Sequence, residues 1–175
     1  EDHQTLAWWA NCTGVTGSPF DAYLTLRGVR TLFARIERQQ ATAGRIAELL
    51  DAHPAVKVVH YPGLKSHPTH ALVAAQQAGP GAMLSFELEG GTEAVRELVE
   101  SLEIFTLAES LGGVESLIAH PASMTHAAMT PEQRATAGIG DGLVRLSVGL
   151  EHVEDLIADL APALDALVQR TQVAA

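Results

Sequence analysis

Residues 105–117 read Phe-Thr-Leu-Ala-Glu-Ser-Leu-Gly-Gly-Val-Glu-Ser-Leu, in which one residue, Leu111, separates Glu109–Ser110 from a double glycine, Gly112–Gly113. Glycine adopts backbone conformations that other residues resist, and it lets a ligand come close to the main chain. We therefore predict a strand over residues 105–108 that ends in a shaped loop rather than in ordinary core.

A second informative stretch is residues 143–148, Leu-Val-Arg-Leu-Ser-Val. Successive residues of a strand point to opposite faces of its sheet, so the even-numbered valines and leucine share one face and Arg145 lies on the other. A single arginine on the more polar face of an apolar strand indicates an anionic target. Taken alone, Arg145 could equally be a core residue paired with Glu115 or Glu151.

Apolar periodicity and turn residues divide the rest of the chain into alternating elements. The expected fold class is α/β: a small, mainly antiparallel sheet covered by helices and preceded by a long connecting helix. Gly28 and Gly44 mark the points where that first helix is expected to bend or split. Helices are expected over residues 21–50, 68–78, 92–102 and 151–168, strands over residues 55–61, 82–88, 105–108 and 143–148, and short helix plus loop over residues 123–137.

The pattern predicts two parts of different character. Residues 52–175 form a self-contained C-terminal domain, whereas residues 1–51 form a connector with a long helix. Trp8 and Trp9 lie in the connector, where large aromatic side chains usually bury against a neighbour. We therefore expect the connector to pack against a partner segment or subunit.

Composition excludes several classes of function. The net charge of −10 argues against nucleic-acid binding, which requires a basic surface. The apolar runs are far too short to span a membrane. Cys12 is the single cysteine and cannot form an internal disulfide, and the first residues do not resemble a signal peptide, so a cytoplasmic location is expected.

Four motifs in order carry a resemblance to a known family: residues 7–32 (AWWANCTGVTGSPFDAYLTLRGVRTL), 81–90 (GAMLSFELEG), 105–127 (FTLAESLGGVESLIAHPASMTHA) and 143–151 (LVRLSVGLE). Together they resemble the C-terminal part of the pyridoxal 5'-phosphate (PLP) enzymes of cysteine and methionine metabolism, which have fold type I. The resemblance implies that residues 1–51 belong partly to the large PLP domain and that residues 52–175 form the substrate-side domain.

Within that family, the resemblance is greatest to transferases that make cystathionine from an O-acylhomoserine and cysteine by γ-replacement. Two alternatives remain open: a cystathionine γ-lyase or an O-acylhomoserine sulfhydrylase. A third is that the isolated chain is a non-catalytic regulatory or oligomerisation module.

The resemblance assigns roles to four residues. Arg145 matches the arginine that binds the substrate α-carboxylate, a task suited to a planar guanidinium. Ser110 matches a catalytic serine near the substrate and the Schiff-base lysine. Glu109 matches a residue that lines the pocket for the distal end of the substrate, and Thr125 matches a residue close to the substrate.

The cofactor lysine of such enzymes has no match in this chain. Lys57 follows a helix stop in a predicted strand and Lys65 lies in a turn, and neither context fits. By resemblance the Schiff-base lysine lies upstream of Glu1, so the cofactor-binding residues within this chain stay unassigned. The partners implied are amino-acid substrates, the N-terminal part of the same enzyme and further copies in a homotetramer.

A metal site is not expected from the sequence. His67 and His70 flank Pro68 without a cysteine or acidic residue nearby, which favours a solvated turn over a zinc site.

Overall fold

The computed structural model describes the backbone of residues 1–15 and 17–173 and the side chains of those residues up to residue 170. Contacts along the chain divide it into two compact units, Glu1–Ala34 and Arg35–Ala175. Each unit is described by itself.

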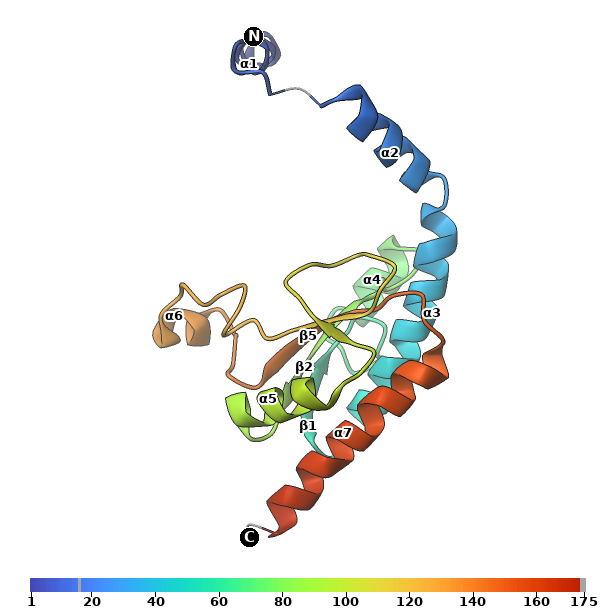
Figure 1. The fold of residues 1–175 in the computed structure, drawn as a ribbon, viewed down its shortest axis with the longest axis vertical. Helices are drawn as coiled ribbons and strands as arrows, with labels where there is room; N and C mark the ends of the chain where they lie inside the picture. Colours follow the sequence, from blue (N-terminus) through green and yellow to red (C-terminus); the bar gives the residue numbers. More distant parts are fainter. Residues whose placement is uncertain (16, 174–175) are drawn as a thin grey trace. The chain divides into compact units, whose positions relative to one another are not determined.

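The larger unit is built on a five-stranded sheet with the order β1-β2-β5-β4-β3. Its strands are β1 (Val56–His60), β2 (Met83–Leu88), β3 (Thr106–Leu107), β4 (Leu117–Ala119) and β5 (Leu143–Ser147). Neighbouring strands run antiparallel except for the β3–β4 pair, which is parallel. The predicted small, mainly antiparallel sheet is therefore confirmed (Figure 1).

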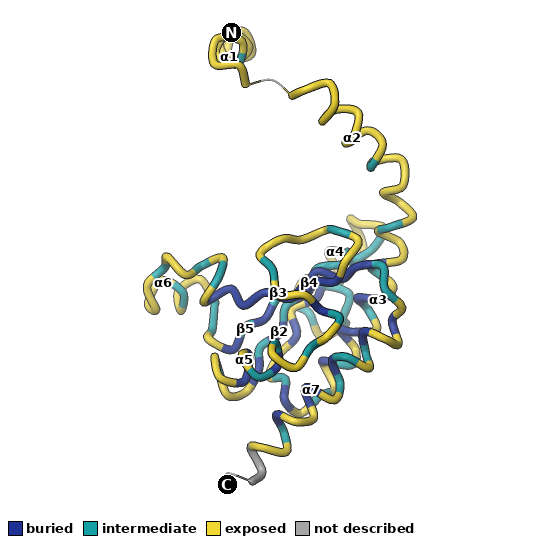
Figure 2. The backbone as a smooth tube through the Cα atoms, viewed as in Figure 1, coloured by how far each residue is buried: buried dark blue, intermediate teal, exposed yellow. Residues whose placement is uncertain are grey.

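Helices α3 (Leu32–Asp51), α5 (Gly91–Ser101) and α7 (Val153–Val173) contribute side chains to one continuous core with the sheet. Alternation in β2 and β5 supplies the strand half of this core, and Figure 2 shows the buried backbone gathered around the strands. Two shorter helices, α4 (His70–Gln76) and α6 (Pro131–Thr136), have no buried residue. The fully buried core side chains include Ile46, Leu50, Phe86, Leu98, Ile118, Val144, Leu146, Leu156, Leu160 and Leu164.

The first predicted helix is split in two. Helix α2 spans Pro19–Val29, and α3 begins at Leu32. The break comes after Val29, one residue beyond Gly28, close to where it was expected, whereas Gly44 lies inside an uninterrupted α3. Strand β4 has only three residues, all buried, and so shows no alternation by which the sequence could reveal it.

The division between the two compact units falls after Ala34. The physical reason is the amphipathic second half of α3. Ala43, Ile46, Ala47 and Leu50 of this helix are fully buried in the core of the larger unit. Burial of each of the larger side chains, Ile46 and Leu50, stabilises the folded unit by about 1.5–3 kcal/mol. This half of α3 is therefore part of the larger unit.

The smaller unit contains α1 (Asp2–Thr13), which the sequence analysis did not predict, and α2. Neither helix has a buried residue. Trp8 and Trp9 meet edge to face with ring centroids 4.8 Å apart, yet both are more than half exposed. The exposed large side chains of this unit include Leu6, Trp8, Trp9, Phe20, Tyr23, Leu26 and Phe33.

A carboxylate on α7 holds the segment that leads into β3. Asp159 Oδ1 accepts a hydrogen bond from the amide of Glu103 at 2.8 Å. Its Oδ2 accepts from the amides of Ile104 at 3.0 Å and Phe105 at 3.1 Å. This one side chain therefore satisfies three consecutive backbone donors beside the core.

Asp159→Ala is expected to lower the free energy of unfolding by about 2–3 kcal/mol, because it leaves those amides without their charged acceptor. Chemical denaturation of the chain measures this. Asp159→Asn keeps one acceptor oxygen and should show a smaller loss, and Gln169→Ala, exposed on the same helix, should change stability by less than about 0.5 kcal/mol. Equal losses for all three variants would contradict the role of Asp159 as the acceptor for these amides.

Candidate functional site

The face of β5 that points away from the core carries Arg145, as the alternation predicted. Its neighbours across the sheet are small: Arg145 pairs with Ser85 of β2 and with Ala119 of β4. Opposed residues in antiparallel strands project from the same face. The arginine side chain therefore leaves the sheet between two short side chains.

Among the residues that the structure describes, the guanidinium of Arg145 has one hydrogen-bond partner and spare donors. Its Nη2 donates to the carbonyl oxygen of Ser110 at 3.0 Å. Its Nε is buried and has no hydrogen-bond partner in the described part of the chain. Among the described residues no carboxylate lies within 4.0 Å of it, so the pairing with Glu115 or Glu151 considered above is not found. A half-buried cation with an unused N–H favours an incoming anion.

The double glycine makes the predicted shaped loop. Gly112 has a φ of +77°, a left-handed conformation that favours glycine. At Gly113 a Cβ would lie 2.5 Å from Oε1 of Glu115, an exposed side chain that can move aside. The path of the loop after Ser110 therefore depends on glycine at Gly112.

Three hydrogen bonds hold the loop against α3, β5 and the residues just after β5. The Gly112 amide donates to Ser147 Oγ at 2.8 Å, and the Gly113 carbonyl accepts from Gln39 Nε2 at 2.7 Å. The Val114 carbonyl accepts from the amide of Leu150 at 2.8 Å. Ser147 is 2% exposed, and it lies two residues from Arg145 on the same face of β5.

A second clamp holds the end of the loop. Ser116, fully buried, donates its amide to Glu151 Oε1 at 2.7 Å and its hydroxyl to Glu151 Oε2 at 2.8 Å. The same hydroxyl accepts from the amide of Gly149 at 2.9 Å. Glu151 therefore accepts both hydrogen bonds that Ser116 donates.

The four predicted site residues do not all meet. Ser110 contacts Arg145 through its carbonyl, and Glu109 is exposed beside it. Thr125 lies on a different segment, exposed, with its hydroxyl 2.8 Å from Nδ1 of His126. Within the described residues no contact is found between Thr125 and either Ser110 or Arg145. The role predicted for Thr125 therefore stays a prediction.

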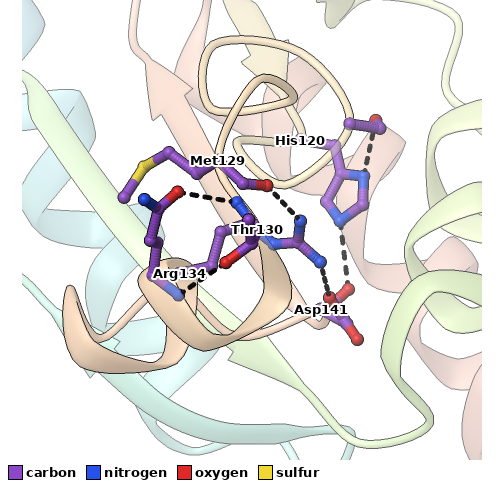
Figure 3. A network of polar contacts seen from close by, with 7 residues as sticks. His120, Met129, Thr130, Arg134 and Asp141 are labelled. Atoms are coloured by element: carbon purple, nitrogen blue, oxygen red, sulfur yellow. Dashed lines mark hydrogen bonds and ion pairs between the residues drawn. The ribbon is translucent and has the colours of Figure 1, made fainter.

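The segment that carries Thr125 is held at its two ends by a polar network that the sequence analysis missed (Figure 3). The buried ring of His120 contacts Ser123 Oγ at 2.8 Å and the carbonyl of Asp141 at 3.0 Å. Arg134 donates to the carbonyl of Met129 at 3.2 Å and to the carboxylate of Asp141 at 3.1 Å. Asp141 thus links both ends of the segment to the start of β5.

The two lysines lie apart from Arg145. Lys57 Nζ is 3.5 Å from Oε2 of Glu89 beside β1, and Lys65 is exposed. Neither contacts Ser110 or Arg145 in the described part of the chain. The unused N–H of Arg145 has the chemistry to bind a carboxylate, and neither lysine of this chain lies beside it.

Histidines and acidic residues do not gather into a metal site among the described residues. The ring of His70 instead contacts the carbonyl of Pro62 at 2.9 Å, and that of His67 accepts from the Thr69 amide at 3.3 Å. Within the same residues, none of the helices combines the length and the apolar character needed to cross a lipid bilayer.

The fold resembles that of solved PLP enzymes of fold type I. A crystal structure of cystathionine gamma synthase from Xanthomonas oryzae pv. oryzae, in complex with aminoacrylate and cysteine, superposes with a TM-score of 0.87 at 67% sequence identity. The match covers 93% of this chain and 42% of that one. The architecture is thus that of part of a PLP-dependent enzyme.

Residues 1–165 match the family of Cys/Met metabolism PLP-dependent enzymes, and the chain belongs to that family. Cystathionine gamma-synthase of Escherichia coli is 56% identical over 155 residues, 89% of this chain and 40% of that protein. L-methionine gamma-lyase of Porphyromonas gingivalis is 54% identical over 156 residues, 89% of this chain and 39% of that protein. The chain spans about 40% of the length of these relatives. The cofactor of the family is PLP, as predicted.

Gly112→Ala is expected to destabilise the loop by about 1–2 kcal/mol, because alanine resists the left-handed conformation at this position. Chemical denaturation gives the size of the loss. The matched control is Gly44→Ala in α3, where a Cβ meets nothing within 4 Å. There alanine should raise stability by about 0.5–1 kcal/mol. A neutral Gly112→Ala variant would show that the turn does not require glycine.

Proposed function

We propose that this chain is the C-terminal, substrate-side portion of a PLP-dependent transferase that makes cystathionine from an O-acylhomoserine and cysteine by γ-replacement. In this reaction the acyl group leaves Cγ as a carboxylate and the sulfur of cysteine forms the new bond to Cγ. The proposal is supported by relatives of that activity at 67% and 56% identity. The observation that carries the role of the site is the guanidinium of Arg145, which donates to the carbonyl of Ser110 and, among the described residues, has no carboxylate within 4.0 Å and an unused Nε–H.

The cofactor supplies an electron sink that weakens the bonds around the substrate α-carbon. The contribution of this chain is to orient the substrate. Arg145 binds the α-carboxylate with two parallel N–H donors, a geometry that an ammonium group cannot provide. Fixing the carboxylate selects which bond at the α-carbon aligns with the cofactor, so orientation decides which bond breaks.

Three further residues complete the proposed site. Ser110 holds the guanidinium with its carbonyl, and its hydroxyl faces the substrate and the cofactor lysine. Glu109 lines the pocket for the distal end of the substrate, where its exposed carboxylate is free of ion pairs among the described residues. Thr125 contributes from the neighbouring segment. The proton-shuttling lysine belongs to the N-terminal part of the enzyme.

A γ-lyase is the second candidate, because an L-methionine gamma-lyase is 54% identical to this chain, nearly as much as the E. coli synthase. Elimination and replacement need the same grip on the α-carboxylate and differ in whether a thiol completes the reaction. The carboxylate site alone therefore does not separate the two activities.

A product assay distinguishes these candidates. The complete PLP-loaded protein that carries this chain is given O-succinylhomoserine or O-acetylhomoserine with cysteine, with sulfide, or with neither, and separately L-methionine or cystathionine alone. We expect cystathionine as the main product with cysteine present. A 2-oxo acid formed from L-methionine or from cystathionine, without cystathionine synthesis, would identify a lyase, and preference for sulfide over cysteine would identify a sulfhydrylase.

We further propose that the exposed apolar side chains of the smaller unit contact the N-terminal part of the enzyme and further copies in a homotetramer, in the cytoplasm. The support is physical: α1 and α2 bury none of their residues, and exposed apolar patches of this kind normally form interfaces. The single cysteine fits a reducing compartment.

Arg145→Lys in the complete enzyme is expected to lower kcat/KM for the amino-acid substrate by the equivalent of about 2–4 kcal/mol, because the bidentate grip is lost. PLP binding, followed by absorbance, should be largely retained. Arg45→Lys is the matched control, since Arg45 pairs with Glu154 on the surface and should be neutral. Unchanged kcat/KM in Arg145→Lys would sink the assignment of the carboxylate site.

A further inference from the structure

Two outward-facing residues of β5 hold the same short segment of the glycine loop. Arg145 donates to the carbonyl of Ser110 at 3.0 Å, and Ser147 accepts from the amide of Gly112 at 2.8 Å. The residues are two apart on the strand, and the backbone groups that they hold are two apart on the loop. Side chains of β5 thereby bind the segment at both of its ends.

This arrangement decides how well the guanidinium is oriented. A free arginine side chain loses rotamer freedom when it is held in one geometry. The carbonyl of Ser110 can hold it only where that carbonyl is itself fixed. The glycine pair next to Ser110 has unusual backbone freedom, so the segment depends on ties from outside the loop.

The structure assigns to Ser147 the role of a positioning residue for the carboxylate grip of Arg145. Its hydroxyl accepts from the amide of Gly112 and so fixes the loop there. The fixed loop holds the carbonyl of Ser110 in place, and this carbonyl orients the guanidinium toward an α-carboxylate. This inference rests on the proposed function of Arg145. Ser147 is almost completely buried and acts through the loop without touching the substrate.

A purely structural role would look different, and the chain offers a matched comparison. Ser116 is also a buried serine whose hydroxyl accepts a backbone amide, that of Gly149, and it also ties the loop to the larger unit. It lies beyond the glycine pair, however, and its partners are Glu151 and Gly149 rather than the Ser110–Gly112 segment. Loss of the Ser116 hydroxyl should loosen the loop end without releasing the carbonyl of Ser110.

The first experiment measures the contact itself in the full chain, residues 1–175. Amide hydrogen exchange at Gly112 should become about fivefold to tenfold faster in Ser147→Ala, because that variant loses the hydrogen bond to this amide. In Ser116→Ala the exchange rate should stay unchanged. The Nε–H signal of Arg145 in the NMR spectrum should broaden in Ser147→Ala alone. Unchanged Gly112 exchange and an unchanged Arg145 signal in Ser147→Ala would overturn the inference.

The second experiment uses the complete PLP-loaded enzyme. Ser147→Ala should raise the KM for the amino-acid substrate about fivefold to tenfold with kcat nearly retained, whereas Ser116→Ala should lower thermal stability and leave KM unchanged. Equal KM values for Ser147→Ala and the wild type, or equal increases in both variants, would contradict a positioning role.

Arg145→Lys distinguishes the proposed function of Arg145 from the positioning role of Ser147. An unchanged KM in Arg145→Lys overturns the proposed function of Arg145 and this inference with it. A raised KM in Arg145→Lys together with an unchanged KM in Ser147→Ala overturns the inference about Ser147 alone.

Discussion

Strand β5 lies between β2 and β4, and its alternation links the core of the larger unit to the candidate site. Val144 and Leu146 point inward and are fully buried, which fixes the strand and its register. A shift of the register by one residue would exchange the two faces. Because hydrophobic burial sets that register, it also sets the positions of Arg145 and Ser147 on the opposite face.

The loop opposite this face is shaped as much by its ties as by its glycines. Three consecutive residues of the loop are held by hydrogen bonds. Gly112 bonds to Ser147 of β5, Gly113 to Gln39 of α3, and Val114 to Leu150 just after β5. These ties come from parts of the chain far apart in sequence. The loop is thereby held by the same elements that form the core, and the site requires the folded unit rather than a local motif.

The sequence predicted those parts of the site that have a local signature. The alternation in β5 placed Arg145 on the outer face, and the double glycine after Ser110 predicted a shaped loop, in which Gly112 has a left-handed φ of +77°. The family resemblance is confirmed as well, by the match of residues 1–165. Local patterns sufficed because each of these features depends on a few neighbouring residues.

Features that depend on distant pairing could not be predicted in this way. Gln39 and Gly113 are 74 residues apart in sequence, and Ser116 and Glu151 are 35 apart, so no periodicity connects them. Strand β4 is three buried residues long and reveals itself only through its pairing with β5. Alternation puts Ser147 on the same face of β5 as Arg145, but its hydrogen-bond partner, the amide of Gly112, depends on the path of the loop.

A structure of the complete PLP-loaded protein with cystathionine bound tests the central claim most directly. The account predicts that an α-carboxylate of the ligand lies about 3 Å from two guanidinium nitrogens of Arg145, with the carbonyl of Ser110 still on Nη2. A ligand whose carboxylates both lie away from Arg145, with the guanidinium engaged by a protein carboxylate instead, would contradict it.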